Sequence, residues 1–185
     1  MNPAFQTKTK ILFIVPYPLG KAPSQRFRME QFFPILQEEG VLYEVASFFD
    51  EKTWKILYGR GSAYQKFIGL VKGYFKRIKL LIVDIHRYDV FIIHREAAPL
   101  GPPLFELLLS KIYRKKYIFD FDDAIWAPKV SSANNLAKYL KSFWKIQYLC
   151  KWAFINTPGN RFLENFAIQS GANKTVYIPT VVDTD

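Results

Sequence analysis

The sequence has 185 residues, 50% of them hydrophobic and 23% charged, which excludes a disordered chain and provides enough apolar material for the core of one domain. Its 26 Lys and Arg outnumber its 16 Asp and Glu, so the formal net charge is +10, and such a basic chain favours partners that carry phosphates or other anions. A single cysteine, Cys150, and two histidines exclude an internal disulfide and a Cys-clustered zinc site, and argue against a histidine-rich metal centre.

The first predicted element is a strand at Ile11–Val15, a continuous apolar run of the kind that is buried on both faces of a parallel sheet. Pro16 ends this run, which is too short for a secretory signal peptide. No apolar stretch approaches the roughly 20 residues that span a bilayer. We therefore expect a reduced, soluble, cytoplasmic protein, with peripheral attachment to the inner face of the membrane as an alternative.

A helix is predicted after the loop that follows this strand. Ser24 stands where an N-cap is expected, apolar residues recur at roughly helical spacing as far as Gly40, and Pro34 is expected to bend the helix. Later in the chain, the predicted strands are Tyr43–Phe49, Asp89–Ile93, Tyr117–Phe121, Ala153–Asn156 and Val176–Pro179. The predicted helices are Ser62–Ile85, Leu104–Tyr113, Asn134–Lys151 and Asn160–Gln169, the last with Gly171 as its C-cap.

This alternation of strands and helices indicates an α/β fold: a Rossmann-like, doubly wound, mainly parallel sheet with helices on both faces. No internal repeat or low-complexity linker interrupts the pattern, so residues 1–185 are predicted to form a single domain. Because the sequence stops just past a predicted strand, we expect it to be part of a longer protein.

Polar and ionisable side chains follow several of the predicted strands, at the edge where an open α/β sheet binds its ligands. These residues are Gly20, Ser24, Arg26 and Arg28 after the first strand, His94, Arg95 and Glu96 after the third, Asp120, Asp122 and Asp123 at the end of the fourth, and Thr157 after the fifth. Two arginines at the start of a helix oppose its dipole, which favours an anionic ligand nearby. Ordinary structural interpretations remain open: a turn at Gly20, a buried and satisfied His94, and an ion pair between Arg95 and Glu96.

The aspartates at positions 120, 122 and 123 repel one another, and we expect one of them to have a raised pKa. Three interpretations are open: a Mg²⁺ site, hydrogen bonds to sugar hydroxyls, and capping of the next segment by Asp122 or Asp123. The first loop contains neither G-x-G-x-x-G nor G-x-x-x-x-G-K-[ST], so dinucleotide and P-loop sites are not supported. The absence of G-x-S-x-G argues against a serine hydrolase.

The predicted helix at 62–85 combines an apolar stripe with basic residues. Lys66, Lys72, Lys76 and Lys79 lie beside the stripe, and Asp84 is the only acidic residue between Lys55 and Arg87. One interpretation is a basic amphipathic helix that lies on an anionic membrane, helped by any exposed aromatic such as Tyr64, Phe67 or Tyr74. The other is a helix packed on the core with a solvated lysine face. Nucleic-acid binding is disfavoured, because the aromatic residues fall in apolar segments.

Four segments resemble the N-terminal domain of GT-B glycosyltransferases of the group 1 (family 4) type. They are ILFIVPYPLGKAPSQRFR from Ile11, FDFDDAIW from Phe119, INTPGNRFLENF from Ile155 and VYIPTVVDTD from Val176. The family's T-x-H-D segment aligns with Asp120, Asp122 and Asp123, so Asp122 stands where many relatives have histidine. The C-terminal donor-binding domain of the family, with its E-x7-E element, is absent from these 185 residues.

The resemblance implies the acceptor-side domain of a retaining glycosyltransferase, which moves a sugar from a UDP- or GDP-sugar to a hydroxyl of a glycan, lipid-linked or polysaccharide precursor. It implies no resident metal or cofactor, and partnership with the C-terminal domain of the same protein, without which this chain is expected to be inactive. We assign Asp122 and Asp123 to catalysis, the loop residues 20, 24, 26 and 28 to acceptor and donor phosphate, and residues 94, 95, 96, 120 and 157 to acceptor binding. The alternative function is a non-catalytic basic module that binds an anionic membrane surface or a phosphate ligand.

Overall fold

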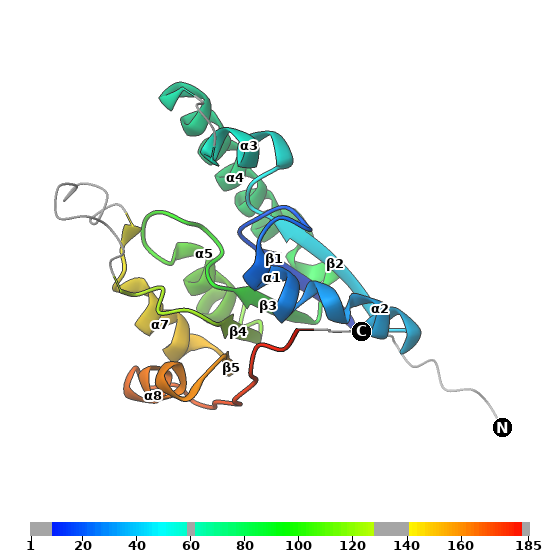
Figure 1. Ribbon diagram of the computed structural model, residues 1–185, viewed down its shortest axis with the longest axis vertical. Coiled ribbons are helices and arrows are strands. Elements are labelled where there is room, and N and C mark those ends of the chain that lie inside the picture. Colours follow the sequence, from blue (N-terminus) through cyan, green and yellow to red (C-terminus); the bar gives the residue numbers. More distant parts are fainter. Residues whose placement is uncertain (1–8, 59–61, 128–140, 183–185) are drawn as a thin grey trace.

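The computed structural model describes residues 9–58, 62–127 and 141–182. Its centre is a five-stranded, fully parallel sheet (Figure 1). The strands are β1 (Lys10–Val15), β2 (Leu42–Ser47), β3 (Val90–His94), β4 (Tyr117–Phe121) and β5 (Ile155–Pro158). The prediction of a Rossmann-like α/β fold is confirmed.

The strand order is β2-β1-β3-β4-β5, so the chain leaves β1 in one direction to build β2 and returns to β1 on its other side to build β3. The boundary between β1 and β3 is therefore the point where the direction of winding changes. In open α/β sheets, a crevice forms there at the carboxyl ends of the strands, and ligands bind in it.

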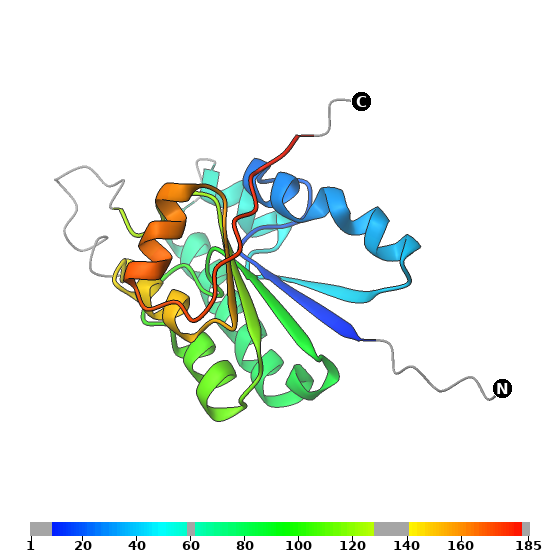
Figure 2. The same ribbon diagram turned by 90° about the horizontal axis from the view of Figure 1, so that it is seen from below.

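Helices cover both faces of the sheet (Figure 2), with α1 and α2 on one face and α4 and α5 on the other. The α-helices are α1 (Pro23–Arg28), α2 (Phe33–Glu38), α3 (Glu51–Tyr58), α4 (Ala63–Lys79), α5 (Leu104–Leu107), α7 (Lys145–Trp152) and α8 (Arg161–Gln169). Short 3-10 or π-helical turns are η1 (Glu30–Phe32), η2 (Leu80–Asp84), η3 (Ile85–Arg87) and η4 (Leu108–Ile112).

Strand β1 shows how the apolar runs divide between the two faces. Leu12 and Ile14 pack into the larger core cluster, which includes Leu80 and Leu81 of η2 and Phe105 of α5, whereas Phe13 and Val15 pack with Met29 beneath α1 and α2. Successive side chains of a strand point to opposite faces, so a continuous apolar run is what a sheet covered on both sides requires.

Helix α4 meets the rest of the domain through small and polar residues. A Cβ atom added to Gly69 would overlap Thr53, and one added to Gly73 would overlap the buried ring of Phe48, so the helix backbone lies directly against its neighbours. Arg77 is buried and donates to the carbonyl oxygens of Val15, Ala46 and Ala97 at 3.0, 3.1 and 2.7 Å. These contacts fix α4 to the carboxyl ends of β1 and β2.

Three predictions about the elements are wrong. The segment at Val176–Pro179 is not a strand. It runs beside β5 with hydrogen bonds to Asn156 and Pro158, but its side chains are exposed, and the isolated bridge to Asn156 is made by Thr175, just before it. Ser24 does not cap α1, because Ala22 holds that position and Pro23 begins the helix. The predicted helix that ends at Gly40 is divided into α1, η1 and α2.

The remaining elements agree with the predictions in type. The predicted helix at 134–151 appears as α7, and residues 134–140 lie outside the described residues. α8 ends at Gln169 and is followed by Gly171 in the left-handed conformation, as expected of a helix terminator. No described helix has the length and apolar character needed to cross a membrane.

Candidate functional site

A hydrogen-bonded cluster at the carboxyl ends of β3, β4 and β5 is centred on the buried carboxylate of Asp120. The sheet register aligns His94 with Asp120 and Asp120 with Thr157, which places the three side chains next to one another on one face. His94 Nδ1 lies 2.8 Å from one carboxylate oxygen, and the Thr157 hydroxyl donates to the other at 2.8 Å. Strand pairing alone therefore assembles half of the cluster.

Helix α1 supplies the other half through Arg28, whose side chain is buried. Its guanidinium forms an ion pair with both oxygens of Asp120 and donates to the carbonyl oxygen of Thr157 at 2.8 Å. It also donates to the carbonyl oxygen of Ile178, in the exposed segment that follows α8. A buried cation is tolerated when every face of it meets an acceptor, and this one meets three.

The pKa of Asp120 is lowered, although burial by itself would raise it. The hydrogen bond and charge of His94, followed by those of Arg28, stabilise the carboxylate and outweigh the burial. Asp120, the most buried of the three aspartates, is therefore not the member of the cluster with the expected raised pKa. Asp120 is a charged structural centre.

Ser24 extends the cluster towards solvent. Its hydroxyl oxygen lies 3.1 Å from His94 Nε2, while His94 Nδ1 faces Asp120. This places serine, histidine and aspartate in one chain of contacts, in which the two ring nitrogens of His94 face Ser24 and Asp120. Asp120 is also neutralised by Arg28, so the arrangement serves to hold His94 and Ser24 in place.

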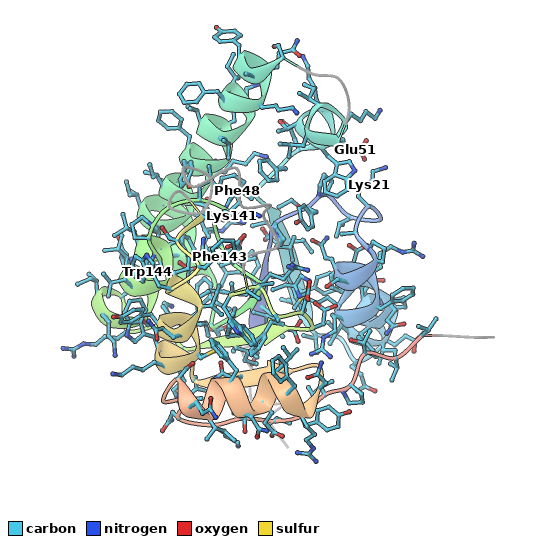
Figure 3. All side chains as sticks on the ribbon, turned by 60° about the vertical axis from the view of Figure 1, so that its left-hand side comes forward. Lys21, Phe48, Glu51, Lys141, Phe143 and Trp144 are labelled. Carbon is cyan, nitrogen blue, oxygen red and sulfur yellow. The ribbon has the colours of Figure 1, made fainter. Side chains whose placement is uncertain are left out.

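A pocket of about 110 Å³ lies at the change of winding direction between β1 and β3. Pro16 and Tyr17 follow β1 and line one part of it, while Arg95 and Glu96 follow β3 and line another. The remaining wall is formed by Pro99, by residues after β4 and by residues at and before the start of α7. These are Asp123, Ala124, Ile125 and Ala127 after β4, Lys141 and Phe143 before α7, and Lys145 and Ile146 in its first turn. Lys141 and Phe143 are labelled in Figure 3.

The backbone is strained where β3 enters this pocket. Arg95 has φ of 64°, and the N–H of Glu96 donates to the carbonyl oxygen of His94 at 2.8 Å, which makes a tight three-residue turn. The turn brings the guanidinium to 4.0 Å from a carboxylate oxygen of Asp122 and 3.7 Å from one of Asp123. Strain of this kind in a residue other than glycine is concentrated at functional sites.

The two aspartates differ in their surroundings. Asp123 lines the pocket and accepts from the N–H of Ala124 at 2.8 Å, whereas Asp122 is not among the lining residues. The Oδ1 atom of Asp122 is buried and has no hydrogen-bond partner among the described residues. This is the oxygen that lies 4.0 Å from the Arg95 guanidinium, so its charge is balanced by an ion pair that is longer than a hydrogen bond.

Gly159, which follows β5, approaches Asp122 closely. A Cβ atom added to this glycine would lie 3.0 Å from the Cα atom of Asp122, closer than ordinary packing allows. The N–H of Gly159 donates to the carbonyl oxygen of Phe121 at 2.9 Å. Because glycine has no side chain, the segment after β5 can pack directly against the backbone of Asp122.

The structure brings most of the sequence-predicted site residues together, and leaves two aside. Ser24, Arg28, His94, Asp120 and Thr157 form the cluster, and Arg95, Glu96, Asp122 and Asp123 gather at or beside the pocket. Gly20 makes a left-handed turn whose N–H donates to Glu30. Arg26 is exposed and lies against the ring of Phe27, away from the cluster.

Sequence reasoning missed Lys145. Its side chain is 3% exposed, its ammonium group lies 2.8 Å from the carboxylate of Glu96, and it donates to the carbonyl oxygen of Ala98 at 2.7 Å. The sequence offers no signal that separates this lysine from the exposed lysines around it.

Within the residues that the structure describes, no group of three or more His, Cys, Asp or Glu side chains could hold a metal ion. No protein-family model and no curated protein matches the sequence.

Proposed function

We propose that this chain is the acceptor-side domain of a retaining glycosyltransferase that transfers a sugar from a nucleotide-sugar to a hydroxyl group. One observation carries the proposal: all four segments on which the family resemblance rests contribute to a single cluster. Ser24 and Arg28 come from the first, Asp120 from the second, Thr157 from the third, and the carbonyl of Ile178 from the fourth. Segments up to 150 positions apart in the sequence thus meet at the ligand-binding edge of the sheet.

The chemistry of the neighbouring pocket suits a polyhydroxylated acceptor. Carboxylates of Asp123 and Glu96 can accept hydrogen bonds from hydroxyl groups, and Arg95 and Lys145 can donate to them. A site that mixes donors and acceptors in this way orients a hydroxyl group without giving it a charge.

In the proposed reaction, the bond between the anomeric carbon and the donor phosphate breaks while a bond forms to the acceptor oxygen. The departing phosphate takes the acceptor's proton, so this domain need not supply a nucleophile. Its residues hold the acceptor oxygen in line and place negative charge near the developing positive charge of the sugar. Asp122 is the candidate for the second role.

The test is donor-dependent sugar transfer by the complete gene product, assayed with a panel of UDP- and GDP-sugars. We expect Asp122→Asn to lower turnover by about 10²-fold or more, because loss of a charge or acid–base group at the reacting centre has effects of that size. Asp123→Asn is expected to raise KM for the acceptor more than it lowers kcat. Glu38→Gln, an exposed carboxylate on α2, is the matched control and should leave both constants unchanged.

The proposal is wrong if no nucleotide-sugar supports transfer by a folded, complete product. It also fails at the residue level if Asp122→Asn behaves like Glu38→Gln. In that case Asp122 has only a structural role in the segment after β4.

A further inference from the structure

Helix α4 turns its apolar side away from the domain. Tyr64, Phe67, Phe75 and Ile78 on α4, together with Ile82 just beyond it, form a stripe that we call the α4 apolar face. Phe75 is 66% exposed and Ile82 is 68% exposed. The predicted apolar stripe is therefore divided: these positions are exposed, whereas Tyr74 is half-buried against Phe48 and Ile85 is buried in the core.

The fold fixes this outward orientation. The side of α4 that meets the domain carries Gly69, Gly73 and Arg77, whose contacts with Thr53, Phe48 and three backbone carbonyls are described above. Rotating the helix to bury the apolar face would remove Arg77 from its acceptors and place bulky rings where the backbone now touches its neighbours. The inward contacts of α4 therefore hold the α4 apolar face at the surface of the domain.

The apolar surface continues onto the neighbouring helix. Between α4 and α5 lies a pocket of about 320 Å³, whose lining includes Ile78, Leu81, Leu104 and Leu108. Leu104 is 58% exposed, and Ile112 at the end of η4 is 67% exposed. Large continuous apolar surfaces are uncommon on soluble domains and mark sites of association with a partner or a membrane.

Basic residues border this surface on one side. Lys72, Lys76 and Lys79 are exposed and follow one flank of α4, while Lys66 is half-buried. α4 contains no acidic residue, and its last turn adds the buried Arg77. A helix with an apolar face and a lysine flank fits an interface where acyl chains meet anionic headgroups.

The position of α4 in the molecule allows such contact. The α3–α4 pair projects beyond the rest of the domain (Figure 1), and the same projection is visible with side chains drawn (Figure 3). A flat surface could therefore meet the projecting part of α4. Among the described residues, nothing packs over Phe75 or Ile82 strongly enough to shield them from solvent.

We propose that the α4 apolar face docks this domain on an anionic lipid bilayer. The aromatic and aliphatic side chains enter the boundary between headgroups and acyl chains, and Lys72, Lys76 and Lys79 contact lipid phosphates. This inference does not depend on the proposed sugar transfer, because it rests on a different surface and concerns binding alone.

The first test is co-sedimentation of the 185-residue chain with vesicles rich in phosphatidylglycerol and with vesicles of phosphatidylcholine alone. We expect binding to the anionic vesicles that weakens between about 0.1 M and about 1 M salt, as the Debye length falls from about 10 to about 3 Å. Each lysine near an anionic surface strengthens binding about fivefold, so changing Lys72, Lys76 and Lys79 to Gln should weaken it roughly 100-fold. The matched control changes Lys116, Lys151 and Lys174 to Gln, which removes the same charge from exposed positions elsewhere.

The second test asks whether the apolar face enters the bilayer. The only cysteine, Cys150, is buried, so Phe75→Cys provides one accessible thiol for a polarity-sensitive fluorophore. We expect its emission to shift to the blue and brighten with anionic vesicles. The same label at Ile168→Cys on α8, an exposed position on another helix, should not respond.

Three results would overturn the proposal. The first is a wild-type chain that stays in the supernatant with anionic vesicles at low salt. The second is equal weakening of binding by the two lysine triples. The third is a chain that self-associates in sedimentation velocity, becomes monomeric when Phe75 and Ile82 are changed to Ser, and does not bind vesicles. That last result would assign the face to a second copy of this chain.

Discussion

Arg28 is the residue on which most of the candidate site depends. It is buried, and it joins α1 to Asp120, to the end of β5 and to the segment around Ile178. A buried ion pair contributes little compared with well-packed apolar groups, but removing one partner leaves an uncompensated charge in the interior. The contribution of the Arg28–Asp120 ion pair to stability is therefore seen when one of the two partners is removed.

We predict that Asp120→Asn lowers the free energy of unfolding by about 3–5 kcal/mol, because Arg28 is left without its counter-charge. Urea denaturation followed by circular dichroism measures this loss. Arg161→Gln is the control, since it breaks a pair in which the arginine side chain is 74% exposed, and the unfolding midpoint should hardly move. A similar small effect at Asp120 would mean that solvent reaches the pair.

The lowered pKa of Asp120 predicts how stability depends on pH. A carboxyl group whose pKa is lower in the folded protein than its ordinary value of 3.8 stabilises the fold fully above that value. This stabilisation is lost as the pH falls through 3.8 towards the folded pKa. The difference in unfolding free energy between wild type and Asp120→Asn should therefore be constant from neutral pH to about pH 5 and shrink below it. Urea titrations across this range test the prediction, and a difference that grows in acid contradicts it.

At the scale of elements, the contact between α4 and the body of the domain depends on glycine. Gly73→Ala should raise the intrinsic helix propensity by up to about 1 kcal/mol, but it forces a methyl group into the ring of Phe48. We predict a net loss of stability of about 1–3 kcal/mol from this overpacking. The double variant with Phe48→Leu provides the control: if the clash is the cause, the second substitution recovers part of the loss caused by the first.

Three strands, β1, β3 and β4, could be predicted from sequence because each carries a dense apolar run. Ile11–Val15 and Tyr117–Phe121 are recognisable alone, since strands covered on both faces leave little room for polar residues. Helix α4 was predicted as a helix but not in its orientation. Periodicity reports that one side is apolar, and it cannot report that Arg77 and two glycines occupy the inward side instead.

The candidate site was predictable only in part. The rule that ligands bind at the carboxyl ends of strands identified Asp120, His94 and Thr157, because their positions follow from strand ends. Lys145 could not be identified in this way: it enters from a helix, and its partner Glu96 is 49 positions away in the sequence. The ion pair between Arg28 and Asp120 was also missed, since each residue was interpreted as facing a ligand.

At the scale of the whole molecule, the proposed function requires a second domain to bind the nucleotide-sugar. We predict that the 185-residue chain by itself does not transfer sugar, even if it binds an acceptor. Incubation with UDP- and GDP-sugars and an acceptor mixture, followed by mass spectrometry of the products, tests this. Turnover beyond slow hydrolysis of the donor would show that this domain holds both substrates.

The hydrogen bonds of Arg28 also constrain the order in which parts of the domain can fold during synthesis. Its partners Asp120, Thr157 and Ile178 lie 92, 129 and 150 positions later in the chain. At about 5–20 residues per second, the ribosome needs roughly 8–30 s after making Arg28 to produce the last of them. During that interval the arginine cannot be buried without leaving its charge unpaired, so α1 should dock late. Ribosome-bound chains halted before β5 should therefore remain open to proteases near α1, long after β1, β2 and β3 have been made.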